Sequence, residues 1–560
     1  MLGLDLISWH LVFFGKVYLL QRLAAKYQEV PRMVHVQNAA CNRTTGRWID
    51  SRWTDETSEW LAIGDDLPAD HLARSIDRLV DMLDLTSLYA SYSGRGSPAY
   101  PPDLMLKVML FEMQLGRMKP AEWARDVIEN RPVQWLLRGH RPTRSRWYVF
   151  RDRLGPILDT WNEQIIQIAM REKLTTAARA VQDGTAVAAH ASRHQLLKSA
   201  TLQRRRLRLL EAVENDLLGL TEISVLPGRP VGFLPDWMAP TPRGRLGQLE
   251  RYARATVEMS RLQEQNLQRA SDRRKNPEDI QISVSEPEVA LGRDKSKVFR
   301  PLYNVQILHD LDSPLILAYN VFAQQNDDRT LEPMLERYME WTGRKPEKLL
   351  ADASYANALD LAVCDAAGVE LYAPYQENSF SAAKRAGKSR KIDKSEFTWL
   401  EDEQTYECPE GHRLYRCGRE QKQRSGGRTL EVVTYRCPAA CCQACPLQKQ
   451  CTSNPSTGRV VKRSEHEHLV DELQSRMASV EGRMLYSLRS QTVELGFADL
   501  KEHRQLRRFT SWGTARARTT VGLLVLARNG LYVIKALSNS AAMHGRLEPP
   551  NDVTLGEIAA

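Results

Sequence analysis

Apolar residues recur at intervals of three and four along residues 70–174, which is the spacing of amphipathic helices. The segment ARSIDRLVDMLDL shows this spacing, and the next segment, SYSGRGSPAYPP, is rich in residues that break helices. Three more helical segments follow, and the last of them is basic. We therefore predict an all-helical domain over residues 70–174.

The pattern changes to alternation after Ala178, where ARAVQDGTAVAAHAS has the two-residue period of a strand. YNVQILHD and SPLILAYNVFA repeat this signal around a turn, and helical and strand segments then alternate as far as VELYAPY. A hairpin followed by alternating helices and strands predicts a mixed α/β sheet. We assign this α/β core to residues 175–194, 285–375 and 464–540, interrupted by a charged helical insert over residues 195–284.

The composition is that of a folded protein with several structural units. The chain has 560 residues, of which 42% are apolar and 26% charged. At roughly 150 residues per domain this suggests three or four units, and it excludes a mostly disordered chain or a disulfide-stapled miniprotein. Residues 1–69 and 541–560 fit the patterns poorly, so we expect a poorly defined N-terminal extension and a C-terminal tail. No N-terminal stretch approaches the ~20 apolar residues of a membrane span, and we expect a cytoplasmic protein without a membrane partner.

Positive charge is clustered along the chain. The formal net charge is +9, from 78 Lys and Arg against 69 Asp and Glu. The excess gathers around Arg138 to Arg153, Arg193 to Arg208, Arg413 to Arg428 and Lys501 to Arg518. A basic last helix in an all-helical domain favours contact with duplex DNA, and the candidate contacts are Arg144, Arg146 and Arg151. Ordinary solvated arginines would give the same composition, and the residues alone leave both interpretations open.

Seven of the nine cysteines lie between Cys408 and Cys451, in a cysteine-rich insert that we place at residues 396–455. Such clustering favours a metal site in a reducing compartment over a disulfide framework. Cys442 and Cys445 have the usual spacing of two Zn²⁺ ligands, and Cys451 with Cys437 or Cys408 would complete a tetrahedral site. The choice among them stays open, as does a set of reduced cysteines without metal.

Three acidic residues are candidates for catalysis. Asp183 lies in a strand pattern before Gly184, Asp352 ends the apolar strand LLA, and Glu494 lies on a late helix with Lys501 seven residues on. Three carboxylates from two strands and a helix could hold two Mg²⁺ or Mn²⁺ ions, which would activate a water or 3′-hydroxyl at a phosphodiester. Taken singly, each aspartate is equally typical of a turn or helix cap.

Other polar residues near these acids are given structural roles. We predict that Asp327, in NDDRTL, is a helix N-cap and not a metal ligand. Tyr303 and Asn304 are expected to support the sheet. His190 and His309 are expected to be structural histidines with satisfied hydrogen bonds.

These motifs occur in a familiar order: VQDGTAVAAHAS, YNVQILHD, NDDRTLEPML, LLADASYANALDL and YSLRSQTVELGFADLKEHRQLRRFTSWG. The sequence over residues 70–540 resembles the DDE transposases of bacterial insertion sequences, most closely the group numbered eleven-eighty-two. Tyr486, Arg489, Glu494 and Lys501 resemble the family's Tyr-Arg-Glu-Lys signature. The common pattern has three residues between Arg and Glu, whereas this chain has four, and one extra residue rotates Arg489 by about 100° on an ideal helix.

The resemblance implies an RNase H-like catalytic core with insertions, an all-helical N-terminal DNA-binding domain and a small zinc-ribbon-like insert. It implies that Asp183, Asp352 and Glu494 hold Mg²⁺, while Tyr486, Arg489 and Lys501 contact DNA. The expected activity is binding of terminal inverted repeats, cleavage of the element's ends and transfer of the 3′-OH strand into target DNA. A bacterial, nucleoid-associated homo-oligomer is expected, because two ends are handled together.

Two other functions remain open from the sequence. A related metal-dependent nuclease would cut DNA without joining it. An inactive or domesticated derivative would bind specific DNA sequences without chemistry.

Overall fold

The computed structural model describes residues 46–218, 234–269, 271, 274–294, 296–375, 392–423 and 428–544. Most of the expected N-terminal extension, and the C-terminal tail after residue 544, lie outside these residues. The described part of the tail continues a helix instead of forming a separate segment.

The N-terminal region is helical and begins at Ser58, before the predicted start at residue 70. Its helices are α2 (Ser58–Asp66), α3 (Leu72–Asp81), α4 (Thr86–Ala90), α5 (Pro102–Gln114), α6 (Pro120–Glu129), α7 (Arg131–Leu136), α8 (Arg144–Leu154) and α9 (Leu158–Arg171). Proline lies in the first turn of α5, α6 and α7, where its missing N–H removes no helical hydrogen bond. These prolines therefore divide one apolar-periodic stretch into several short helices.

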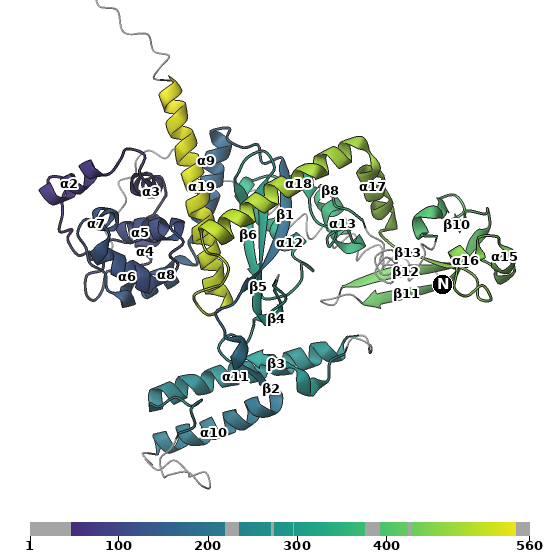
Figure 1. The fold of residues 1–560 in the computed structure, drawn as a ribbon, viewed down its shortest axis with the longest axis horizontal. Coiled ribbons are helices and arrows are strands. Elements are labelled where there is room, and N and C mark those ends of the chain that lie inside the picture. Colours follow the sequence, from purple (N-terminus) through teal and green to yellow (C-terminus); the bar gives the residue numbers. More distant parts are fainter. Residues whose placement is uncertain are drawn as a thin grey trace, which may run out of the picture.

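A six-stranded mixed sheet forms the centre of the molecule (Figure 1). Its strands are β1 (Arg179–Ala188), β4 (Ala290–Arg293), β5 (Phe299–Asp310), β6 (Ile316–Phe322), β7 (Lys348–Leu350) and β8 (Glu370–Tyr372). The order is β4-β5-β1-β7-β8, with β6 also paired to β5. β1, β5 and β6 form an antiparallel meander, whereas β7 runs parallel to β1 and β8 parallel to β7.

Helices cover both faces of this sheet. They are α12 (Leu331–Thr342), α13 (Ala358–Ala367), α17 (Glu467–Ala478), α18 (Val480–Ala498) and α19 (Thr514–His544). α18 packs against β1 and β5, and Gly496 allows the close approach, because a Cβ there would lie 2.0 Å from the His309 ring. The sheet order and its flanking helices fit an RNase H-like core.

The helical region and the sheet share one hydrophobic core. A single cluster of buried apolar side chains runs from Ile63 through the sheet to Ile534. α19 joins the two parts, because it packs against α3, α5 and α9 as well as β6. The sequence patterns predicted a separate N-terminal domain, but α9 packs on α12 and α19 and is as much a part of the α/β core as of the helical region.

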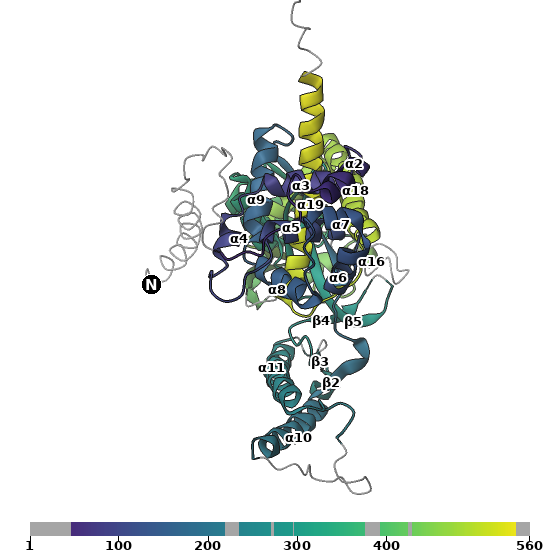
Figure 2. The ribbon, with the colours of Figure 1, turned by 90° about the vertical axis from the view of Figure 1, so that its left-hand side faces the viewer.

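Two inserts have small cores of their own. In the first, α10 (Ser199–Leu217) and α11 (Pro242–Leu267) form a hairpin beside β2 (Leu196–Lys198) and β3 (Gln281–Ser283), and Figures 1 and 2 show it projecting from the body. The second is a five-stranded sheet in the order β13-β12-β11-β10-β9. Its elements are β9 (Thr398–Leu400), β10 (Thr405–Glu407), β11 (Arg413–Gln423), β12 (Thr429–Arg436), α15 (Ala439–Ala444), α16 (Gln448–Cys451) and β13 (Val460–Ser464).

One described helix is long and apolar enough to cross a membrane. This is α19, over Thr514–Asn539, and 67% of its most apolar window is buried inside the fold. Its apolar side chains pack against neighbouring helices and β6, which is the behaviour of a core helix.

We expect Asn529→Ala to destabilise the protein by about 2–4 kcal/mol. The Asn529 side chain, only 1% exposed, accepts from the Ile316 N–H at 3.0 Å and donates to the Ile316 carbonyl at 2.8 Å, at the edge of β6. Removing the amide leaves both backbone groups buried without a partner. Urea unfolding measures the change, and Asn539→Ala, at an exposed position of the same helix, is the control. Equal stability of the two variants would contradict this role.

Candidate active site

Asp183 lies on β1, and Asp352 lies two residues after the end of the neighbouring parallel strand β7. Val181 of β1 is paired with Leu350 of β7, and the same register continued by two residues places Asp183 opposite Asp352. The Asp352 carboxylate accepts hydrogen bonds from the Ser354 backbone N–H at 2.8 Å and from its hydroxyl at 2.5 Å. Asp352 therefore also forms the turn that its sequence context favoured.

α18 places Arg489 over the first acid. Its Nη2 lies 3.1 Å from Asp183 Oδ1, and its side chain is 18% exposed. Tyr486, one turn earlier, is half-buried and close enough to Asp183 and Asp352 for their charges to raise the pKa of its phenol, in addition to burial. The extra residue between Arg489 and Glu494 therefore does not remove Arg489 from the site.

Arg489 faces the acids, whereas Glu494, which follows it after one residue more than in the common pattern, faces solvent. Val493 and Phe497 face the sheet on α18, and Glu494, about 100° further round the helix, is exposed. The sequence predicted that Glu494 would converge with the two aspartates, and the structure does not bring it to them. Among the described residues, no group of three Asp, Glu, His or Cys side chains is arranged to hold a metal ion.

Lys501 reaches the same face of β1. It lies on a π-helical turn, Asp499–His503, directly after α18, and its ammonium donates to the Thr185 hydroxyl. Thr185 is two residues after Asp183, so the two side chains point to the same side of the strand. A π-helical turn widens the helix locally and often occurs at functional sites.

Asp327 is the acid that sequence reasoning assigned wrongly. The N-cap of α12 is Thr330, and Asp327 makes no cap. Its Oδ1 accepts hydrogen bonds from Asn304 Nδ2 at 2.8 Å and Gln306 Nε2 at 2.6 Å. A signal for this was present, because Asn304 and Gln306 are polar residues two apart on an otherwise apolar strand and so share one face.

Gly184 is required by this polar network. A Cβ at this position would lie 2.0 Å from Gln306 Nε2, 2.5 Å from Asp327 Oδ1 and 2.9 Å from Asn304 Oδ1. Only glycine leaves room for these groups behind Asp183, which explains the Asp-Gly pair on β1.

The three aspartates influence one another electrostatically. Burial raises the pKa of Asp183 to about 6, Arg489 opposes this rise, and the charges of Asp352 and Asp327 add to it. Burial and the Asp352 charge also raise the pKa of Asp327, against its hydrogen bonds from Asn304 and Gln306. The three carboxylates are partly buried, and Arg489 is the cation beside Asp183 among the described residues, an arrangement that favours binding of an added cation.

The predicted DNA contacts on α8 are of two kinds. Arg144 and Arg146 are exposed. Arg151 is 4% exposed and donates to the Asp152 carboxylate at 2.7 Å, so it is a structural residue and not an exposed DNA contact.

His309 is buried, and its Nε2 has no hydrogen-bond partner among the described residues, whereas satisfied hydrogen bonds were expected. Burial lowers the pKa of its imidazole to about 3, so the ring is neutral. It packs edge-on against Phe497 of α18, with ring centroids 6.2 Å apart. His190 packs against Trp512.

The cysteines gather at one end of the second insert. The Sγ atoms of Cys408 and Cys442 each accept a backbone N–H at 3.3 Å, from His412 and Arg459. Burial, a hydrogen bond with Cys442 and the nearby Cys408 raise the pKa of the Cys437 thiol. Burial also raises the pKa of Cys451, against Arg459 and together with Cys442 and Cys445. A zinc-ribbon geometry is not shown by these contacts.

The α/β core fits the RNase H-like arrangement, with Asp183 on β1 and Asp352 just after β7. Comparison with known families narrows the kind of protein. A family model described as "Transposase DDE domain" matches residues 407–532, and "Transposase domain (DUF772)" matches residues 61–153. Together they support a DDE transposase of the insertion-sequence type, a class of enzyme that acts on DNA. No curated protein and no solved structure matches the chain.

Asp183→Asn is expected to stabilise the metal-free protein by about 1–3 kcal/mol at pH 7.5. The folded pKa of about 6 exceeds the unfolded 3.8, so the native state binds the proton more tightly and loses stability as pH rises from about 4 to 6. The asparagine variant has no such charge. Urea unfolding in EDTA at pH 4 and pH 7.5 tests this, and the gain should nearly vanish at the lower pH. A destabilised variant at pH 7.5 would contradict the expectation.

Proposed function

We propose that this protein is a DNA transposase that binds the terminal inverted repeats of its own element, cleaves the ends and joins the 3′-OH strand to target DNA. The observation that carries the proposal is the proximity of Asp183, on β1, to Asp352, just after β7, with Arg489 of α18 at 3.1 Å from Asp183. The two family matches support it as well, because one covers the N-terminal helices and the other runs from the second insert through α18 into α19.

The residues present fit a divalent ion in part. Asp183 and Asp352 supply the oxygen ligands that Mg²⁺ and Mn²⁺ prefer, and the raised pKa of Asp183 reflects carboxylate charge that a cation would neutralise. A bound pair of ions would activate a water or 3′-hydroxyl and stabilise the leaving oxygen. Asp327 and Glu494 are the two candidates for a third carboxylate. Asp327 has electrostatic contact with the pair, and Glu494 has the sequence signature.

The basic residues of the site would bind the DNA strand. Arg489 offers a planar guanidinium that can exchange Asp183 for a phosphate once a cation occupies the acids. Lys501 presents an ammonium on the face of β1 that carries Asp183, where it can hold the next phosphate. Tyr486 can donate its phenol hydrogen to the same strand. These assignments place the scissile phosphate between α18 and the ends of β1 and β7.

A second candidate function follows from the exposure of Glu494. If the third carboxylate is absent, the protein is a sequence-specific DNA-binding derivative of a transposase. A nuclease without strand transfer differs from both, because it would yield cut ends and no joined product. In each case the helical region, with Arg144 and Arg146, would contact DNA, and we propose a homo-oligomer that pairs two ends in a bacterial nucleoid.

Cleavage and joining of a DNA fragment that carries the element's ends, in Mg²⁺, tests the proposal. We expect Asp183→Ala and Asp352→Ala each to lower both rates by at least about 100-fold, because each removes an oxygen ligand, while DNA binding is kept. Asp402→Ala, at an exposed position of the second insert, is the control. Equal activity of wild type and Asp183→Ala would overturn the mechanism. Binding without cleavage by the wild type would favour the DNA-binding derivative.

The same assay identifies the third acid. Loss of activity in Glu494→Gln but not in Asp327→Asn assigns Glu494 and requires α18 to turn during the reaction. The opposite result assigns Asp327, whose carboxylate is already adjacent.

We also propose that the cysteine cluster holds a structural Zn²⁺. Cys408, Cys437, Cys442, Cys445 and Cys451 lie within electrostatic reach of one another, and two of them accept backbone N–H bonds of the kind that orient thiolate ligands. Zn²⁺ would deprotonate these thiols despite their burial.

Metal analysis of the purified chain should find about one zinc per molecule. Cys442→Ser is expected to lose the zinc and unfold the second insert, because it removes a central ligand. Cys417→Ser, on the exposed face of β11, should retain it. Zinc-free wild-type protein from zinc-supplemented medium would contradict the assignment.

A further inference from the structure

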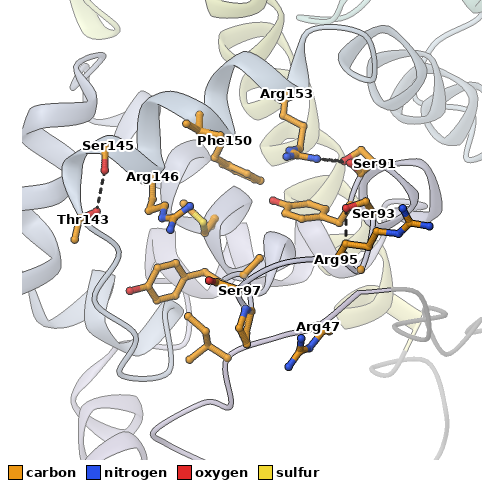
Figure 3. A pocket seen from close by; sticks show the side chains of 18 residues that line it. Arg47, Ser91, Ser93, Arg95, Ser97, Thr143, Ser145, Arg146, Phe150 and Arg153 are labelled. Atoms are coloured by element: carbon orange, nitrogen blue, oxygen red, sulfur yellow. Dashed lines mark hydrogen bonds between the residues drawn. The ribbon is translucent and has the colours of Figure 1, made fainter.

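A cavity of about 620 Å³ lies between α8 and the loop that joins α4 to α5 (Figure 3). One wall is α8, with Arg146, Val149 and Arg153. The opposite wall is the Ser91–Tyr100 loop, which Ile49 and Ala99 fasten to the preceding chain through an Ile49 N–H to Ala99 carbonyl bond of 2.9 Å. The volume is that of a site for a small molecule or a single nucleotide. The cavity is far from the acids in sequence, and apart from Arg146, a proposed DNA contact, its lining residues have no role in the functions proposed above.

The cavity carries positive charge without compensation. Four arginines line it, Arg47, Arg95, Arg146 and Arg153, and no lining residue is a carboxylate. None of the four makes an ion pair with a described acid. Arg95 and Arg146 are exposed and make no side-chain hydrogen bond within the described residues. Arg153 donates to the Ser91 carbonyl, and its Nε is buried with no described partner. Such a set of guanidiniums is suited to a phosphate.

The helix end adds further donors. α8 begins at Arg144, its Thr143 N-cap makes no side-chain cap, and its first turn contains no acid. Thr143, Ser145 and Arg146 line the cavity, so the positive end of the helix dipole lies at its edge. The hydroxyls of Ser93, Ser97 and Ser145 line the same cavity.

Between the arginines the lining is apolar and aromatic. Phe150 lies between Arg146 and Arg153 in Figure 3, and Tyr92, Tyr100 and Met105 line the cavity with it. Val149, 55% exposed, borders the opening. A purely phosphate-binding surface needs no such lining, whereas a base requires flat apolar surface to stack upon.

We propose that this cavity binds one unpaired nucleotide of a DNA strand, with its base against Phe150 and the tyrosines and its phosphate on Arg95 and Arg146. Duplex DNA cannot supply this ligand without opening, because its bases are stacked inside the helix. The proposal rests on the proposed function for the source of the strand, since a frayed or cut DNA end presents unpaired nucleotides. The N-terminal helical region is otherwise expected to bind duplex DNA. The cavity would add a site that binds DNA only where the two strands have separated.

Binding of the full-length protein to labelled DNA in EDTA tests the proposal by fluorescence anisotropy. The probes are oligothymidylate of about 12 nucleotides, a duplex of equal length and free thymidine monophosphate. We expect Arg95→Ala to weaken single-strand binding by about tenfold and to lower its salt slope by about 0.7 for the lost phosphate contact, with duplex binding changed by less than about twofold.

A second variant tests the contact with the base, and a third serves as a control. Val149→Trp fills the opening without changing charge, and it should weaken single-strand binding by about tenfold. Arg171→Gln removes an exposed arginine paired with Glu172 on α9 and should change nothing. Both positions are at the surface, and circular dichroism verifies that each variant is folded.

Three results would overturn the proposal. An equal loss for duplex and single strand means that Arg95 belongs to a duplex-binding face. Unchanged single-strand binding in Val149→Trp means that no base enters. Competition by thymidine monophosphate at the same concentration as the oligomer means that the site takes free nucleotides. Because cleavage is not measured here, failure of the transposase mechanism leaves this binding test unaffected.

Discussion

The ion pair between Arg489 and Asp183 is the contact on which the arrangement of the site depends. Asp183 is partly buried on a central strand near Asp352, and a partly buried carboxylate near another is costly without a cation nearby. Arg489 of α18 is that cation, and it opposes the rise in the pKa of Asp183. Gly496 lets the same helix lie close to the His309 ring, and so helps α18 to pack on the sheet.

The shared hydrophobic core also stabilises the position of α18, although its residues lie outside the site. α19 is largely buried between the N-terminal helices and β6, and Asn529 on it completes the backbone hydrogen bonds of Ile316. The π-helical turn with Lys501 lies between α18 and α19, so packing of the helical region on α19 also restrains the catalytic helix. The helical region, which is expected to bind DNA, and the sheet that carries the candidate acids therefore share one packed core. Such packing would suit an enzyme that cuts DNA at a fixed distance from the sequence that it binds.

The positions of the four acids show which parts of the sequence motif predict the geometry of the site and which do not. Asp183 lies on β1 and Asp352 follows the end of β7, so the parallel pairing of these strands brings the two acids near each other, and the apolar runs that precede both acids predicted the strands. The third acid was not, because one residue on a helix shifts a side chain by about 100°, and Glu494 faces outward while Arg489 faces in. Asp327 looked like a cap because it precedes a helix. Its carboxylate instead binds two amides from β5, a strand that the linear sequence separates from it by a turn and another strand.

The sequence by itself determined the helical N-terminal region, the mixed sheet and the two inserts, because periodicity and short motifs are local properties. Only the tertiary structure decided that the helical region and the sheet share one core, that Arg151 is buried while Arg146 is exposed, and that four arginines surround a cavity without a carboxylate. These properties depend on contacts between residues far apart in the chain, such as α19 on α3 or the Ser91–Tyr100 loop against α8. Composition and spacing record no such contact, because burial and charge compensation arise only when distant segments pack together.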